Sequence, residues 1–100
     1  MNTERKTEIE RLVDEIVDGV IHWCWNVSPD PALDCLYYHS ELDKFSDIMC
    51  AYASRREECE EIVDKLSDDE YKYMAQLYDS IMEEYIKEVE ERFKELEELE

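Results

Sequence analysis

Residues 67–99 read SDDEYKYMAQLYDSIMEEYIKEVEERFKELEEL, and this stretch decides the fold class. Ser67 and Glu70 have the spacing of a capping box, in which the two side chains satisfy backbone amides at the start of a helix. The acids that follow Ser67 favour the positive end of a helix dipole. Apolar residues then recur on one helical face: Tyr71, Met74, Tyr78, Ile81, Met82, Tyr85, Val89, Phe93 and Leu96. The sequence therefore predicts one helix over residues 68–99.

The length of this helix limits how the chain can be arranged. At 1.5 Å per residue it is about 48 Å long, whereas a compact chain of 100 residues has a radius of gyration of only ~13 Å. The helix must project, lie in an elongated bundle or pair with a second chain. We expect an elongated bundle and a homodimer formed through this helix.

A second helical pattern lies near the start of the chain. Its apolar face consists of Ile9, Leu12, Val13, Ile16, Val17, Val20, Ile21 and Cys24, which predicts a helix over about residues 3–25. Asn2 or Thr3 can cap it. The helix ends before Pro29 and Pro31, because each proline disfavours helix at the preceding residue. Asp30 then has the position of a cap for a new helix with Pro31 in its first turn.

The middle of the chain gives an ambiguous pattern. One apolar face contains Leu33, Leu36 and Tyr37, and a second face, rotated by about 120°, contains Leu42, Phe45, Met49 and Tyr52. This rotation predicts a kink near residues 39–41. Residues 54–57 match a capping box that would start another helix, but Cys59, Ile62, Val63 and Leu66 continue the second face in phase. We therefore expect a helix over residues 31–66 with a kink near 39–41, and prefer a continuous helix through Ser54 to a break there, which stays an open alternative.

Together these patterns predict an all-α fold, an elongated bundle of three long amphipathic helices in a single domain over residues 1–100. A single glycine and two prolines are too few for the many turns of an all-β domain. The apolar fraction of 44% is sufficient for a hydrophobic core.

The strongest compositional feature is charge. The chain has 29 acidic residues against 11 lysines and arginines, a net charge of −18. This excess of acids excludes direct binding to nucleic acid, which requires clustered cations, and docking on anionic lipid. No apolar run approaches the ~20 residues of a membrane-spanning helix. No signal peptide is visible, so we expect a cytoplasmic protein (host cytoplasm if viral) whose four cysteines are reduced thiols.

The sequence offers one candidate metal site, formed by His22, Cys24, Cys35 and His39. Cys35 and His39 are four residues apart and can share a helical face, as paired ligands must. However, His22 and Cys24 lie 200° apart on a helix, and a cysteine on an apolar face usually serves as a small hydrophobic residue. We expect no metal and no cofactor, although binding of an ion by Cys24, Cys35 and His39 stays an open alternative.

Catalytic motifs give no indication of an enzyme. Glu15-x-x-Asp18 and Glu61-x-x-Asp64 resemble half of the magnesium site of all-α nucleoside-triphosphate pyrophosphohydrolases, but neither has a Glu-x-x-Glu at the right distance upstream. The chain contains no glycine-rich phosphate loop and no calcium-binding loop. We therefore expect a protein without catalytic activity.

The acids cannot all be neutralised within their own helices, because the cations are too few. A basic surface of another protein is the natural partner, since a strong field accelerates association. Residues 68–100 carry 13 acids and 4 bases, about one net charge per 5 Å of helix. Duplex DNA carries one per ~1.7 Å, so a mimic of DNA requires acids pooled from several helices or two chains.

In size, acidity and lack of catalytic motifs the chain resembles small phage-encoded inhibitors of host defence, such as anti-CRISPR proteins. The sequence hypothesis is an inhibitor that occupies the basic site of a nucleic-acid-binding protein. The alternative is a helical adaptor or oligomerisation module without mimicry. The residues expected to contact the partner are Asp68, Asp69, Glu83, Glu84, Glu88 and Glu91, with Asp14 and Asp18 if the first helix adds to the same face. Tyr73 and Trp25 are the expected aromatic contacts, and the alternative is that they pack under the loop at residues 26–31.

Overall fold

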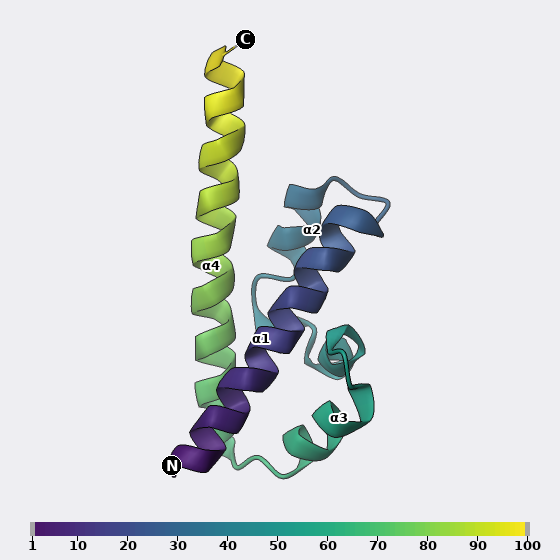
Figure 1. The fold of residues 1–100 in the computed structure, drawn as a ribbon, viewed down its shortest axis with the longest axis vertical. Coiled ribbons are helices and arrows are strands. Elements are labelled where there is room, and N and C mark those ends of the chain that lie inside the picture. Colours follow the sequence, from purple (N-terminus) through teal and green to yellow (C-terminus); the bar gives the residue numbers. More distant parts are fainter. Residues whose placement is uncertain (1, 100) are drawn as a thin grey trace.

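The computed structural model describes residues 2–99, which form an all-helical structure without a strand (Figure 1). The longest dimension is 50 Å and the other two are 25 and 19 Å. The elements in chain order are α1 (Thr3–Asn26), α2 (Ala32–Tyr38), the 3-10 helices η1 (Leu42–Lys44) and η2 (Ser46–Tyr52), α3 (Arg56–Asp64) and α4 (Asp68–Leu99). The predicted all-α fold is confirmed.

Helix α1 begins and ends close to the residues expected from its pattern. The Asn2 side chain accepts a hydrogen bond of 2.8 Å from the Arg5 amide, as a residue that caps a helix does. Every residue of the predicted apolar face is buried except Ile21, which is half-buried. The face therefore turns towards the core along the whole helix.

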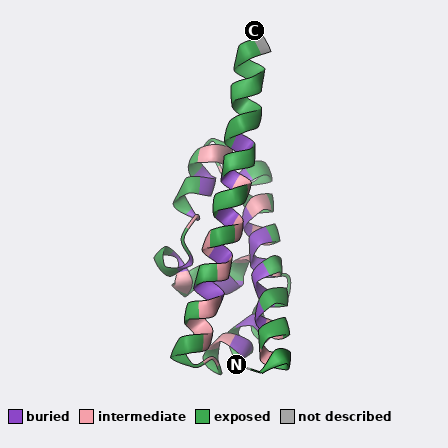
Figure 2. Ribbon diagram, turned by 90° about the vertical axis from the view of Figure 1, so that its left-hand side faces the viewer, coloured by how far each residue is buried: buried purple, intermediate pink, exposed green. Residues whose placement is uncertain are grey.

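Helix α4 has the predicted capping box at its start. The Glu70 amide donates to Ser67 Oγ over 3.2 Å, and the Ser67 amide donates to Glu70 Oε1 over 2.9 Å. This bond from the Ser67 amide, together with Arg5, lowers the pKa of the Glu70 carboxyl. Towards the other end the helix leaves the body of the protein, and residues 90–98 are all exposed (Figure 2). The helix thus projects, which is one of the arrangements that its length required.

Helices α1 and α4 pack side by side and run in the same direction (Figure 1). Near their starts Arg5 Nε lies 3.2 Å from Glu70 Oε2. Further along, Trp25 Nε1 donates to the Tyr85 hydroxyl over 2.8 Å. The buried faces of the two helices contribute most of one continuous apolar core, which also contains residues of α2, η1, η2 and α3.

The prediction of one long helix over residues 31–66 is wrong. Helix α2 starts after Pro31, without a side-chain cap from Asp30, and ends at Tyr38. Two 3-10 helices follow, and Ala53 is extended with ψ of 148°, so the chain breaks before α3. Spacings of three, such as Leu42 to Phe45, fit a 3-10 helix as well as an α-helix. The phase match of Cys59 and Ile62 arose because α3 faces the same core after a turn.

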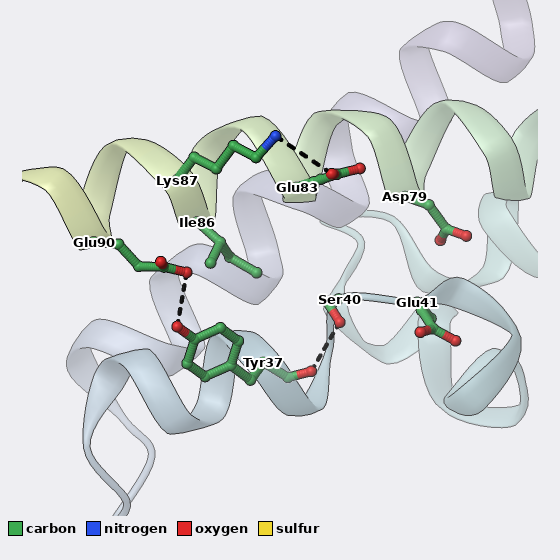
Figure 3. Close-up of a pocket in the computed structure, with 8 residues that line it drawn as sticks. All are labelled: Tyr37, Ser40, Glu41, Asp79, Glu83, Ile86, Lys87 and Glu90. Carbon is green, nitrogen blue, oxygen red and sulfur yellow. Dashed lines mark hydrogen bonds and ion pairs between the residues drawn. The ribbon is translucent and has the colours of Figure 1, made fainter.

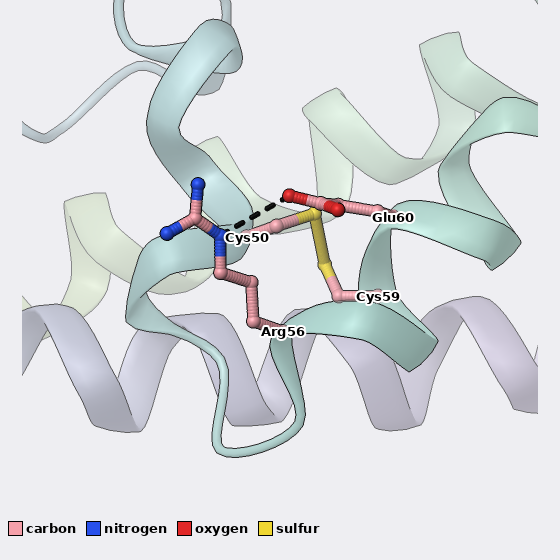
Figure 4. Close-up of a disulfide and its surroundings, with 4 residues drawn as sticks. All are labelled: Cys50, Arg56, Cys59 and Glu60. Carbon is pink, nitrogen blue, oxygen red and sulfur yellow. Dashed lines mark hydrogen bonds and ion pairs between the residues drawn. A yellow bond between two sulfur atoms is a disulfide. The ribbon is translucent and has the colours of Figure 1, made fainter.

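The expectation of four reduced thiols is also wrong for one pair. Cys50 at the end of η2 and Cys59 in α3 form a disulfide, with Cα atoms 5.6 Å apart (Figure 4). The turn at residues 53–55 reverses the chain and brings both side chains into the core, where Cys50 is 8% exposed and Cys59 fully buried. Next to the bridge Arg56 Nε lies 3.1 Å from Glu60 Oε1.

Gly19 lies where α1 passes close to the backbone of Tyr52. A Cβ placed on Gly19 would overlap the carbonyl oxygen of Tyr52 and lie 2.7 Å from its carbonyl carbon. The only glycine in the sequence therefore lets the backbone of η2 reach that of α1.

Within residues 2–99, no helix combines the length and the apolar composition needed to cross a bilayer.

Candidate functional site

An open groove runs between α2 and α4 (Figure 3). It consists of two adjoining hollows of about 490 and 480 Å³, which share Lys87 and Glu90. Helix α2 and the connection at Ser40 and Glu41 form one wall, and α4 forms the other from Asp79 to Glu97. We call this feature the acidic groove.

Most of the charged side chains along the groove are acids. Two lysines, Lys87 and Lys94, line it, and six carboxylates do so: Glu41, Asp79, Glu83, Glu90, Glu91 and Glu97. Lys87 is already paired with Glu83, its Nζ 3.5 Å from Oε1 in an exposed pair. The groove therefore has an excess of four negative charges, open to solvent.

The floor of the groove is apolar. Ile86 is 5% exposed at its base, half-buried Leu33 lies on the α2 side, and Phe93 is 38% exposed towards the projecting end of α4. Apolar side chains between carboxylates are a pattern suited to recognition, because burial supplies affinity while the charges select the partner.

Two hydrogen bonds fix the walls of the groove. The Tyr37 hydroxyl of α2 donates to Glu90 Oε1 of α4 over 2.7 Å (Figure 3), and this bond raises the pKa of Tyr37. The Leu42 amide at the start of η1 donates to Asp79 Oδ1 over 2.9 Å. A hydroxyl and an amide donor thus hold α2 and η1 against α4 at the groove.

Asp79 is the least exposed acid of the groove. Burial raises the pKa of its carboxyl, the Leu42 amide opposes that effect, and the carboxylates of Asp43 and Glu41 raise it further. A cation placed in the groove would relieve the repulsion among these carboxylates.

The structure divides the acids expected at a partner surface into groups. Glu83 and Glu91 line the groove, whereas Glu84 and Glu88 are exposed on α4 outside it. Asp68 and Asp69 are exposed in the first turn of α4, more than 20 residues before Glu90 and so about 30 Å away along the axis. Asp14 and Asp18 are exposed on α1 and do not line the groove.

The two expected aromatic contacts both pack between α1 and α4. Tyr73 is half-buried, and its hydroxyl donates to Glu10 over 2.9 Å, a bond that raises its pKa. Trp25 is 44% exposed, donates to Tyr85, and has its ring 6.3 Å from that of Phe93. Both side chains thus pack against the protein itself, between α1 and α4 and not under the loop at residues 26–31.

Sequence reasoning missed four of the six carboxylates, Glu41, Asp79, Glu90 and Glu97, together with Tyr37. The spacing of Asp79, Glu83 and Glu90 places them on one side of α4, and this was the signal in the sequence. Their significance depends on α2 packing beside that face, which the expected long middle helix concealed.

The cysteines and one histidine of the candidate metal site do come together. The sulfur atoms of Cys24 and Cys35 and a ring nitrogen of His39 lie within 4.8 Å of one another, and all three residues are buried. His22 is not part of this cluster: it is exposed, with Nδ1 3.2 Å from Asn26 Nδ2.

No protein-family model, curated protein or solved structure matches the chain. Its function must therefore be inferred from the charge and geometry of its own residues.

Proposed function

We propose that the protein binds a basic, amphipathic segment of another protein in the acidic groove. The observation that carries the proposal is the combination of six carboxylates with an apolar floor in one open groove. A partner helix with lysines and arginines flanking an apolar stripe matches both features, since it would cover Leu33 and Phe93 while its cations lie between the carboxylates.

The finer form of the proposal is inhibition by mimicry. The groove adds Glu41, which lies outside α4, to five acids of α4. The protein then occupies a basic site at which the partner binds nucleic acid, in the manner of small phage-encoded inhibitors of host defence.

One observation favours the alternative of an adaptor or oligomerisation module. Leu96 is 58% exposed at the projecting end of α4, close in sequence to the half-exposed Phe93. These side chains would suit pairing with a helix through apolar contacts, including α4 of a second copy. Binding of that kind changes little with salt, so the same titration distinguishes the two functions.

The direct test is a fluorescence anisotropy titration with a labelled synthetic helix of 18 residues that carries leucines on one face and lysines and arginines elsewhere. We expect its affinity to fall at least about tenfold between 0.05 and 0.5 M salt, because exposed charges are then screened beyond a few Å. An acidic helix with the same leucines is the control and should not bind. Tight binding that is unchanged at ~0.5 M salt would favour the adaptor.

The mimicry step has a separate test in a host extract. Proteins retained by the immobilised chain should be released by duplex DNA or RNA as well as by salt. Release by salt but not by nucleic acid would leave the groove as a binding site and overturn mimicry.

Asp79 provides a local reporter of occupancy. Because its pKa is raised by burial and by Asp43 and Glu41, cations of the bound peptide should lower it towards the ordinary value. Peptide affinity should correspondingly fall as the pH drops through that pKa, since the proton then competes with the cation. Carboxyl NMR titration with and without the basic helix measures the shift. An Asp79 pKa that is unchanged at saturation would place the peptide elsewhere.

The variant Asp79→Asn is the control for this titration. Its side-chain oxygen can still accept the hydrogen bond from Leu42, but it carries no charge. The variant should lose that part of the pH dependence of peptide binding while keeping its fold.

A further inference from the structure

Cys24 and Cys35 form a buried pair at the junction of α1 and α2. Their Sγ atoms lie 2.6 Å apart, and the two residues are 2% and 5% exposed. Cys24 is in the last turn of α1, Cys35 is in the middle of α2, and the loop between the helices contains both prolines. The pair thus spans the turn that positions α2.

The spacing of the sulfur atoms does not fit a shared metal ion. Two thiolates on a tetrahedral zinc, each about 2.3 Å from the ion, lie roughly 3.8 Å apart. The observed distance of 2.6 Å is much shorter and exceeds an S–S bond length by only about 0.5 Å. The two sulfur atoms therefore need to approach by only about 0.5 Å to be joined.

His39 is also engaged in a way that makes it a poor ligand. Its Nδ1 lies 2.9 Å from the Cys35 carbonyl oxygen, to which it can donate, and its Nε2 lies 2.8 Å from the Tyr52 hydroxyl. Both ring nitrogens therefore have partners within the protein. Among the described residues, no fourth histidine, cysteine or acid completes the cluster.

A reagent can reach the pair from one side. Cys35 and His39 lie at the base of a hollow of about 360 Å³, whose rim includes Trp23, Tyr38 and Ile48. Those three rim residues are at least 38% exposed. Cys35 lines this hollow and Cys24 does not, so Cys35 is the sulfur expected to react first.

We propose that Cys24 and Cys35 are the site of a second disulfide, which ties the end of α1 to α2 and completes the pairing of all four cysteines. The oxidant is a small-molecule disulfide. Cys35 loses its proton and attacks one sulfur of the reagent, whose other sulfur leaves as a thiol. Cys24 then loses its proton, attacks Cys35 Sγ and releases the second thiol. Two thiols become one disulfide, and the reagent is reduced to two thiols.

The bond has a structural consequence for the groove. Helix α2 carries Tyr37 and Leu33, which form one wall, and it is a short helix of seven residues without a side-chain cap. A covalent link to α1 fixes its position beside α4. The inference does not depend on the function proposed for the groove.

The test starts from fully reduced, full-length protein that is exposed to oxidised glutathione and then unfolded in N-ethylmaleimide. We expect no alkylated cysteine, a mass lower by four hydrogens, and peptide fragments in which Cys24 is linked only to Cys35. The variant Cys24→Ser/Cys35→Ser is the matched control and should form only the Cys50–Cys59 bridge.

Three results would overturn the proposal. The first is alkylation of Cys24 and Cys35 while Cys50 and Cys59 are paired. The second is linkage of Cys24 or Cys35 to Cys50 or Cys59. The third is stoichiometric zinc, added as its chloride to reduced protein, that is retained through gel filtration by the wild type but not by Cys24→Ser/Cys35→Ser.

Discussion

Replacing Gly19 with alanine should destabilise the protein by about 3 kcal/mol or more. The added Cβ would overlap the Tyr52 carbonyl oxygen, and because that atom belongs to the backbone, no side-chain rotation can relieve the clash. Helix α1 would have to move away from η2, which disturbs the core between them. The expected sign is diagnostic, since alanine in an unobstructed helix is more favourable than glycine by about 1 kcal/mol.

Urea unfolding followed by circular dichroism measures this effect. The matched control is Ser80→Ala, an exposed position within α4, where alanine should be neutral or slightly stabilising because only helix propensity changes. A Gly19→Ala protein as stable as the wild type would show that η2 does not lie against α1 as described.

The two long helices could be predicted because several local signals agree in each. In α4 the capping box of Ser67 and Glu70 and a continuous apolar face point to the same boundaries. In α1 the Asn2 cap and the face from Ile9 to Cys24 do the same. Such agreement of independent local preferences is typical of elements whose formation needs little tertiary context.

The fold of the middle of the chain depends on tertiary contacts, which the local pattern of apolar residues does not reveal. The close approach of Tyr52 to Gly19, the hydrogen bond from Leu42 to Asp79 and the Cys50–Cys59 bridge together hold η1, η2 and α3 in place. Each of the three contacts joins two different segments of the chain. Periodicity alone therefore favoured a long helix where tertiary contacts break it.

The candidate site was predictable only in part for the same reason. Acid-rich faces of α4 were evident, and Glu83 and Glu91 do line the groove. The sequence could not rank them above Glu84 and Glu88, because the difference lies in which face α2 covers. Tyr37 and Glu41 come from the segment whose fold was wrongly predicted, so they had no visible connection with α4.

Reversing two groove charges, Glu83→Lys together with Glu90→Lys, should weaken binding of the basic helix at least about tenfold, a loss of about 1.4 kcal/mol. Each substitution replaces attraction with repulsion at a partly exposed contact, where a single pair contributes ~0.2–1 kcal/mol. Both residues line the same hollow, on one side of α4 (Figure 3). Their effects should therefore act on the same segment of the peptide.

Two control variants separate the loss of groove charge from a change in net charge and from the loss of the Tyr37–Glu90 hydrogen bond. Glu84→Lys/Glu88→Lys changes the net charge equally on the same helix but outside the groove. Tyr37→Phe removes the hydrogen bond to Glu90 without a change of charge. Circular dichroism should show that all three variants keep the helical content of the wild type.

The most direct measurement of the proposed function is the ratio of the peptide dissociation constants of these two double variants, at a salt concentration of about 0.15 M, where the screening length is ~8 Å. A binding site confined to the acidic groove predicts that Glu83→Lys/Glu90→Lys binds at least about tenfold more weakly than Glu84→Lys/Glu88→Lys. Equal loss in both variants would contradict it, because the protein would then attract basic partners through its net charge alone.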